Sequence, residues 1–356
     1  MHDSAAGPAS YPTVTLEEIA DAFPSFGRTL ILTHVNPDGD CVGSAFALAH
    51  LIEATGKEAR VVCPTPLPRR LRFLAGNDET ADRTVLGAGE AEGYDTLLAV
   101  DVASPVQLGD FAPLIPRVCF LIDHHGLGTP FAPHLVDPKA SAAGEIVSRL
   151  YALLRDRGTV PALPEAARCL YAAIAADTGS FAFSNTTEET MRTAGALLSE
   201  INADAAKTGR PDTAEICRIL FAQRTFRELT AERHTVEGLR FFEDGRLAAV
   251  LFTQQNLADW GLTEEDIGNA VDTPRAVEGV LVALSLRQQK ADPRAYKVSS
   301  RANADVNCAA VCARFGGGGH VRAAGCTITA DTPEEALAVA AAAFGEAIRT
   351  WTADHT

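Results

Sequence analysis

The sequence lacks any long apolar run. Charged residues or prolines interrupt its hydrophobic residues, 47% of 356, before the ~20 consecutive apolar residues that a membrane-spanning helix needs. The opening MHDSAAGPAS also lacks the basic stretch and apolar core of a signal peptide. We therefore expect a soluble, cytoplasmic protein with a flexible tail over residues 1–12 and no contact with a membrane.

Paired cysteines are also missing. The eight cysteines are scattered, and none has the CxxC spacing of a zinc site or a redox motif. We expect free, buried thiols in a reducing cytoplasm.

Positive charge is scarce. The chain has 31 basic and 46 acidic residues, a formal net charge of −15. Such a surface repels a long polyanion, which argues against long duplex nucleic acid as a partner. A small phosphorylated ligand is still compatible, because metal ions inside a cleft reverse the local field.

The first half of the chain alternates short apolar runs with helical patterns, which is typical of an α/β fold with a mostly parallel sheet between helices. We predict the helix over 41–55 to begin at Asp40 as its N-cap and to end at Gly56 as its C-cap. The predicted strands are 28–33, 59–63, 95–100 and 117–122, and the other predicted helices are 142–157, 164–176 and 187–201.

The second half predicts a smaller α+β domain. The pattern lapses between Ala203 and Pro211, and an Arg- and Glu-rich helical stretch follows over about 213–237. We therefore predict a first, catalytic domain over 13–203, a linker with a helix over 204–238 and a second domain over 239–356, with the active site in the cleft between the domains. The predicted strands of the second domain are 246–252, 279–287 and 295–301, and its predicted helices are 305–313 and 333–349.

Metal-binding residue types follow the first predicted strand. His34, Asp38 and Asp40 lie in one loop, which Pro37 stiffens and Gly39 turns. Sites in open α/β sheets form at such strand ends. A polar turn with a helix cap is the alternative, and it explains Asp40 well but His34 poorly.

Two further strands end in the same way. One runs into Asp101, the other into Asp123, His124 and His125, and Asp177 closes a later helix. With the first loop, these residues provide enough ligands for two divalent cations that share one carboxylate. Four carboxylates would balance two such ions and would repel one another without them. Mixed oxygen and nitrogen ligands suit manganese, although they do not exclude magnesium, zinc or cobalt.

Four segments, HVNPDGDCVGS, VDVAS, DHH and DTGSF, occur in this order within residues 30–185. Together they resemble the four motifs of the DHH phosphoesterase superfamily. The resemblance implies two manganese ions, with Asp101 as the bridge between them. One ion would bind His34, Asp38 and Asp101, and the other Asp40, Asp101, His124 and Asp177.

The second domain carries Arg301 at a strand end and the segment Gly316–Gly319 followed by His320. Glycines allow a close approach of the backbone, and their N–H groups can bind an anion. With the following RAAG, this segment resembles the DHH-associated domain of the nanoRNases, the bifunctional oligoribonuclease and phosphoadenosine phosphate phosphatase group. We expect the substrate to bind Arg301, Gly317, Gly318, Gly319 and His320.

The resemblance implies hydrolysis of short oligoribonucleotides to mononucleotides, and of 3′-phosphoadenosine 5′-phosphate to AMP. We expect in-line attack on phosphorus with both metal ions taking part, His125 stabilising the developing charge and Asp123 orienting a ligand histidine. The glycine motif argues against pyrophosphatases and exopolyphosphatases of the superfamily, and the length argues against RecJ-like exonucleases. Relatives often carry a basic residue where this chain has Ala182, so the substrate preference stays open.

Two alternatives remain at this stage. One is a phosphodiesterase for cyclic di-AMP or its linear product pApA, with the same metal ions. The other is a nucleotide-binding regulatory module without catalysis, which the intact set of ligand residues disfavours. The oligomeric state also stays open, and a homodimer is one alternative.

Overall fold

The computed structural model describes residues 11–355 except 88 and 269. The chain divides into two compact units, of which the first ends at Gln223 and the second begins at Arg224. Residues 1–10 of the predicted tail lie outside the described residues. No described helix combines the length and the apolar character needed to cross a membrane.

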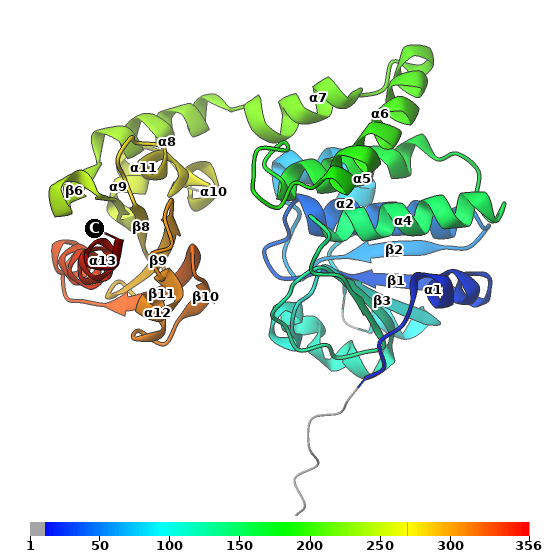
Figure 1. Ribbon diagram of the computed structural model, residues 1–356, viewed down its shortest axis with the longest axis horizontal. Coiled ribbons are helices and arrows are strands. Elements are labelled where there is room, and N and C mark those ends of the chain that lie inside the picture. The colour runs from blue at the N-terminus through cyan, green and yellow to red at the C-terminus, as the bar shows by residue number, and fades with distance from the viewer. Residues whose placement is uncertain (1–10, 88, 269, 356) are drawn as a thin grey trace, which may run out of the picture. The chain divides into compact units, whose positions relative to one another are not determined.

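Unit 1 is built on a five-stranded parallel sheet with the order β2-β1-β3-β4-β5 (Figure 1). The predicted parallel sheet between helices is therefore confirmed. The fifth strand, which is only three residues long, was not predicted. The strands are β1 Thr29–Leu32, β2 Ala59–Val62, β3 Thr96–Val100, β4 Val118–Asp123 and β5 His134–Val136.

Helices of unit 1 cover the sheet because successive strand side chains point to opposite faces. Ile31, Leu98 and Ile122 pack into the core under α2, α4 and α5, whereas Leu30 and Leu97 pack with the 3₁₀ segments on the other face. The helices are α1 Leu16–Ala22, α2 Gly39–Glu53, α3 Asp78–Asp82, α4 Ala143–Asp156, α5 Pro164–Asp177, α6 Glu188–Thr208 and α7 Thr213–Cys217, and the shorter helical segments are η1 Phe23–Ser25, η2 Arg69–Ala75, η3 Glu90–Gly93, η4 Pro105–Arg117 and η5 Arg218–Ala222.

Several predicted helices differ from the observed ones. The last helix, α13 Pro333–His355, continues beyond the predicted end at 349. The structure extends α6 to Thr208, where Gly209 in the left-handed region (φ +69°) ends it, so the predicted end at 201 was wrong. Polar residues such as Asn202 and Asp204 suggested a loop, but Ala and Lys between them favour a helix. The predicted single helix over 213–237 is in fact interrupted before α8, which Thr225 caps.

Unit 2 has a mixed six-stranded sheet with the order β10-β11-β9-β8-β7-β6. All pairs are antiparallel except β7 with β8. The predicted α+β domain is confirmed, although β6, β10 and β11 and the short helices were not predicted. The strands are β6 Arg240–Phe242, β7 Leu247–Phe252, β8 Val282–Gln288, β9 Ala295–Ala302, β10 Gly318–His320 and β11 Ala323–Thr329, and the helices are α8 Phe226–Glu237, α9 Gln254–Asp259, α10 Glu264–Ile267, α11 Asp272–Arg275, α12 Cys308–Ala313 and α13 Pro333–His355, with the 3₁₀ turn η6 Glu243–Gly245.

Candidate active site

The carboxyl ends of β1, β3 and β4 bring the predicted residues together. His34 follows β1, Asp101 directly follows β3, and Asp123 ends β4. The strand order changes direction between β1 and β3, so the edge between these two strands is the topological switch point at which α/β sheets form their sites. Asp101 and Asn36 both have φ in the left-handed region, +57° and +56°. Strained backbone of this kind clusters at functional sites.

Helix α2 has two carboxylates at its N-terminal end, Asp38 before it and Asp40 in its first turn. Asp38 is the N-cap, and its side chain accepts a hydrogen bond from the backbone N–H of Cys41 at 3.0 Å. The prediction of Asp40 as the N-cap was therefore wrong by two residues. Gly39 is the first residue of the helix, and α5 packs so closely that a Cβ at this position would lie 2.4 Å from the Cβ of Ala176. The helix ends at Glu53 with Ala54 as the C-cap, two residues before the predicted Gly56.

Asp40 is buried, with 1% exposure, and backbone of α4 holds its carboxylate. The N–H groups of Ala143 and Gly144 donate to Oδ2 and Oδ1 at 2.7 and 2.9 Å, and the hydroxyl of Ser44 donates to Oδ1 at 3.0 Å. The N-terminal end of α4 therefore stabilises the negative charge and fixes its direction. Sequence analysis missed this contact, although the run of small residues before α4, ASAAG, allows such a close approach.

Asp101 lies between two histidines. Its Oδ2 is 3.5 Å from Nε2 of His34, and its Oδ1 is 3.6 Å from Nε2 of His124. Both separations exceed hydrogen-bond length. Asp101 is 2% exposed, and its buried Oδ1 has no hydrogen-bond partner. An orphaned buried carboxylate oxygen is costly unless a cation binds it.

His124 extends the cluster toward two more carboxylates. Its Nε2 is 3.7 Å from Oδ2 of Asp40 and 3.6 Å from Oδ2 of Asp177, while Asp38 Oδ1 lies 3.8 Å from Nε2 of His34. Ligands that bind an ion at ~2.0–2.2 Å lie about 3–4 Å from one another, so these separations suit side chains that share a cation. All six predicted ligands are brought together, and they fit divalent metal ions.

The carboxylates of this cluster repel one another when they are ionised. Burial, followed by the charges of Asp101 and Asp177, raises the pKa of Asp40 well above its usual value. Burial also raises the pKa of Asp177, to about 6, although the neighbouring His124 opposes the shift. Clustered carboxylates therefore resist ionisation together, and a bound cation would relieve that repulsion.

The two adjacent histidines have different partners. His125 Nδ1 donates to Asp123 Oδ1 at 2.7 Å, and this hydrogen bond, with the charge of Asp101, raises the pKa of His125 to about 9. The carbonyl of Ala140 faces Nδ1 of His124 at 3.4 Å. Asp123 therefore orients His125 and not the ligand histidine that we predicted, because the residue at i+2 lies on the same side of the extended chain.

A strained loop follows Asp177. Gly179, Ser180 and Phe181 all have φ between +56° and +68°. The hydroxyl of Thr178 accepts from the N–H of Phe181 at 3.0 Å, and the side-chain amide of Asn185 donates to the carbonyl of Asp177 at 3.1 Å. These bonds fix the loop beside the carboxylate.

The predicted substrate residues of unit 2 are neighbours in one sheet. Arg301 pairs with Ala323, and Ala323 pairs with His320, so Arg301 and His320 occupy one cross-strand row and point to one face. Gly317 and Gly319 contact β11 itself, because a Cβ at these positions would lie 2.2 Å from the carbonyl oxygen of Gly325 and 2.5 Å from that of Ala323. Gly318 meets nothing within 4 Å and is the open glycine of the three.

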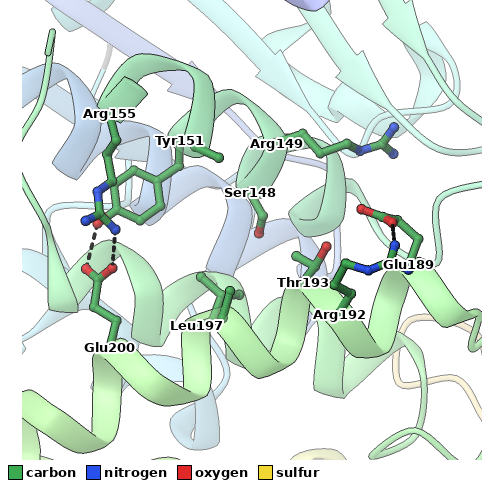
Figure 2. Close-up of a pocket in the computed structure, with 11 residues that line it drawn as sticks. Ser148, Arg149, Tyr151, Arg155, Glu189, Arg192, Thr193, Leu197 and Glu200 are labelled. Atoms are coloured by element: carbon green, nitrogen blue, oxygen red, sulfur yellow. Dashed lines mark hydrogen bonds and ion pairs between the residues drawn. The ribbon is translucent and has the colours of Figure 1, made fainter. Parts of the chain in front are cut away.

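A separate pocket of about 270 Å³ lies between α4 and α6 (Figure 2). Several of its polar groups are paired with one another: Arg155 and Tyr151 bind Glu200, and Arg192 binds Glu189. None of the six predicted metal ligands lines it. The carboxylate and histidine cluster is therefore the better candidate for catalysis.

Comparisons with known proteins agree with this architecture. The description "DHH family, N-terminal domain" matches residues 28–174, and "DHHA1 domain" matches residues 246–348. The bifunctional oligoribonuclease and PAP phosphatase NrnA of Thermus thermophilus is 34% identical over 305 residues, 85% of this chain and 84% of that protein. The cyclic-di-AMP phosphodiesterase GdpP of Geobacillus thermodenitrificans is 27% identical over 87% of this chain and 46% of its own length.

Among solved structures, an exopolyphosphatase-related protein from Bacteroides fragilis has a TM-score of 0.80 at 22% identity, covering 93% of this chain and 95% of that one. This likeness concerns the fold. The predicted family is confirmed by both domain matches and by the similarity to NrnA. The chain therefore belongs to the DHH phosphoesterases, in the subgroup that joins a DHH domain to a DHHA1 domain, and it is a hydrolase of phosphoester or phosphodiester bonds.

Proposed function

We propose that this protein is a manganese-dependent hydrolase that converts short oligoribonucleotides to mononucleotides and 3′-phosphoadenosine 5′-phosphate to AMP. The observation that carries the proposal is the ligand cluster centred on the buried, unpartnered Oδ1 of Asp101. The name of the Thermus relative supports the substrate class.

We assign His34, Asp38 and Asp101 to one divalent ion and Asp40, Asp101, His124 and Asp177 to the other. Both groups combine imidazole with carboxylate, and carboxylate-rich sites of this kind suit manganese. When bound, the two ions would activate water and neutralise the negative charge of the phosphate. The α4 backbone N–H groups fix the direction of the Asp40 carboxylate, and Asp101 would serve both ions.

His125 is the proposed catalytic residue. Because Nδ1 donates to Asp123, the ring is held in one orientation and Nε2 is left to face the substrate. A proton held on that nitrogen would donate to a phosphate oxygen as charge develops on it. Asp123 acts through His125 and is a positioning residue.

Substrate recognition is assigned to unit 2. Arg301 and His320 share one row of the sheet, where a guanidinium and an imidazole can bind an anionic group from one side. The N–H groups near Gly318 have free space around them. Small nucleotides fit this assignment better than long nucleic acid, since the chain carries a net charge of −15.

A second candidate is hydrolysis of cyclic di-AMP or pApA, which the match to GdpP over 87% of this chain supports. The same metal ligands would serve both reactions. The two candidates overlap in pApA, which is itself a dinucleotide, and they differ in whether the ring of cyclic di-AMP, which has no chain end, is opened.

One panel tests both functions. Metal-stripped protein with added Mn²⁺ is offered di- to pentaribonucleotides, 3′-phosphoadenosine 5′-phosphate, pApA and cyclic di-AMP, and products are resolved by chromatography. We expect the ribonucleotides and the phosphoadenosine phosphate to be hydrolysed, and chelation to abolish the activity. Ca²⁺ should restore it less well than Mn²⁺. Full activity without metal would refute the proposal, and a clear preference for cyclic di-AMP would favour the second candidate.

A further inference from the structure

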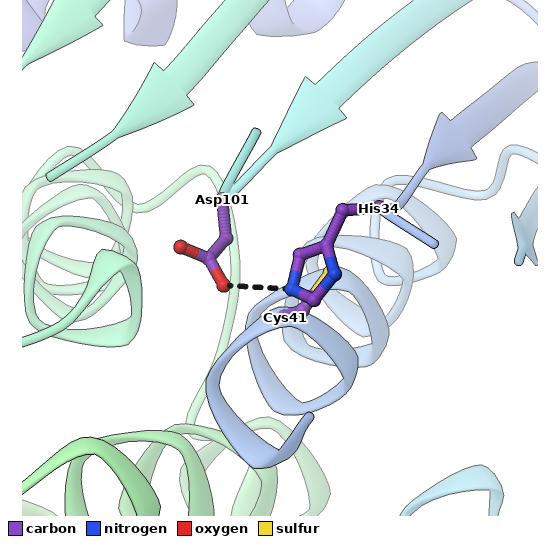
Figure 3. A group of neighbouring side chains, drawn as sticks. All are labelled: His34, Cys41 and Asp101. Carbon is purple, nitrogen blue, oxygen red and sulfur yellow. Dashed lines mark ion pairs between the residues drawn. The ribbon is translucent and has the colours of Figure 1, made fainter. Parts of the chain in front are cut away.

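Cys41 lies against the metal-ligand cluster, but neither the sequence pattern nor the proposed function uses it. The side chain projects from the first turn of α2 and is 0% exposed. Its Sγ, a ring nitrogen of His34 and a carboxylate oxygen of Asp101 all lie within 4.8 Å of one another (Figure 3). Among the residues that the structure describes, no other cysteine belongs to such a group.

The group has the dimensions of a metal site with one sulfur ligand. Zinc binds sulfur at ~2.3 Å and imidazole nitrogen at ~2.0–2.1 Å. Two such donor atoms on one ion can therefore lie up to ~4.4 Å apart. Nε2 of His34 and Oδ2 of Asp101 are already 3.5 Å apart. The Sγ of Cys41 lies within 4.8 Å of ligand atoms of both side chains, which is close to the separation of two donors on one ion.

The hydrogen bond of the sulfur to the backbone is weak. Its hydrogen-bond contact is a long one, 3.8 Å to the carbonyl oxygen of Val100 at the end of β3. A thiol is a weak donor at best. Because β3 ends at Val100 and Asp101 follows, the same turn of chain holds the sulfur and the proposed bridging carboxylate side by side.

The two halves of the cluster differ in whether a sulfur atom lies among the candidate ligands. The other groups of candidate ligands, Asp40 with His124 and Asp177, and Asp101 with His124 and His125, contain only nitrogen and oxygen. Soft thiolate ligands select zinc and similar ions, whereas carboxylates suit manganese and magnesium. The half of the cluster near His34 therefore differs chemically from the half near His124.

We propose that Cys41 is a sulfur ligand of the metal ion held by His34 and Asp101, and that it gives this half of the cluster a preference for thiophilic ions such as Zn²⁺ and Co²⁺. The inference rests on the proposed two-metal function and adds to it. The protein would then hold two unlike ions, or would bind Zn²⁺ at one half more tightly than Mn²⁺.

Cobalt absorption tests the sulfur contact directly, because a cobalt–thiolate bond produces a near-ultraviolet charge-transfer band that oxygen and nitrogen ligands do not. Full-length metal-stripped protein is titrated with Co²⁺ in three forms: wild type, Cys41→Ser and Cys63→Ser. Cys63 is the matched control because it is also buried, follows β2 and belongs to none of the ligand groups. We expect the band in wild type and Cys63→Ser and its loss in Cys41→Ser.

Competition with a chromophoric chelator gives a second measurement. Cys41→Ser should lower the Zn²⁺ affinity by roughly tenfold or more, with Mn²⁺ affinity changed much less, and Cys63→Ser should alter neither. Circular dichroism and thermal melting establish that each variant is folded, and Cys41→Ala provides a second variant if serine at this buried position disturbs the fold.

The outcomes separate this inference from the proposed function. Co²⁺ binding with visible ligand-field bands but no charge-transfer band in wild type would overturn the role of Cys41 and leave the metal-dependent function standing. An equal band in Cys41→Ser would do the same. Failure to bind any of these ions would overturn the proposed function itself.

Discussion

The carboxylate of Asp101 faces ring nitrogens on both sides, from His34 and from His124, and its left-handed backbone is held by an N–H bond to the carbonyl of Ile122 at 2.9 Å. One residue thus occupies the centre of the cluster, whereas Asp123 lies behind His125. Asp101 and Asp123 follow neighbouring strands and are equally buried, so they form a matched pair for mutation.

We expect Asp101→Ala to lower kcat/KM by at least ~10²–10³-fold and to reduce the bound metal, because one carboxylate serves both ions. Asp123→Ala should keep its metal and lose activity less severely. Elemental analysis and steady-state kinetics on the same samples provide the measurement. Equal, mild losses at both positions would contradict the bridging role.

His125→Ala should depress kcat while leaving KM close to normal, since the proposed group acts chiefly in the transition state. Arg301→Ala and His320→Ala should raise KM for nucleotides roughly ten- to a hundredfold, as expected for the loss of a charge-assisted hydrogen bond worth ~1.5–3 kcal/mol. Metal content should be unchanged in the last two. Hydrolysis of a nitrophenyl phosphate diester, which lacks ribose and base, should fall strongly in His125→Ala and only weakly in Arg301→Ala and His320→Ala. If Arg301→Ala lost the hydrolysis of nucleotides and of the nitrophenyl diester to the same extent, this result would contradict a role of Arg301 in binding the nucleotide.

Among the elements, the glycine-rich segment around β10 combines two kinds of glycine. Gly317 and Gly319 are required by the close approach of β11, and Gly318 is not. We therefore expect Gly317→Ala to destabilise unit 2 by about 1–3 kcal/mol through overpacking against the carbonyl of Gly325. Gly318→Ala should fold normally. Thermal unfolding of both variants tests this difference in stability, and the KM for nucleotides is then measured for the stable variant. Equal melting temperatures would show that β11 can move away from the segment.

The elements that sequence analysis predicted correctly are those with a strong period. The core strands β1 to β4 and the helices α4 and α5 agree with the predictions to within one or two residues. The missed strands are β5 and β6, which have three residues each, and β10 and β11. Strand β10 has no apolar side chain, and β11 begins with small residues, although its second half, CTIT, alternates apolar and polar residues. Pairing with β9 makes β11 a strand, and a single sequence does not contain that information.

The candidate site could be predicted further than the fold. All six proposed ligands follow strand ends or lie at helix ends, and the topology of a parallel sheet brings such positions together. Contacts between distant segments could not be predicted. The α4 N–H groups on Asp40 and the pairing of Asp123 with His125 depend on side-chain directions, which residue spacing alone leaves open.

For the whole molecule, the raised pKa values make stability depend on pH. The pKa of Asp177 is about 6 in the folded protein against a usual value of 3.8. The folded state therefore binds more protons than the unfolded state between these values, and its stability falls as pH rises through that window. In metal-free protein we expect Asp177→Asn to melt at about the same temperature as wild type at pH 4 and to be more stable at pH 7.

The difference at pH 7 should be about 1–2 kcal/mol, since the side chain is 33% exposed and solvent screens part of the effect. Added Mn²⁺ should reverse the order, because it stabilises the wild type by binding only its folded state. Differential scanning calorimetry at the two pH values, with and without Mn²⁺, provides the measurement. A metal-free wild type that is more stable than the variant at pH 7 would contradict the repulsion.

The ligands that meet at Asp101 come from positions spread between His34 and Asp177. During synthesis, the ribosome must therefore release the whole of α5 before the last of these side chains can join the cluster. Until then the nascent chain carries unmatched acidic groups and unpaired strand edges, and a parallel sheet assembles slowly because its partners are distant in sequence. The first unit can therefore complete this cluster only after α5 has emerged, whereas the second unit, in which no described residue belongs to the ligand groups, can fold once its own strands have been made.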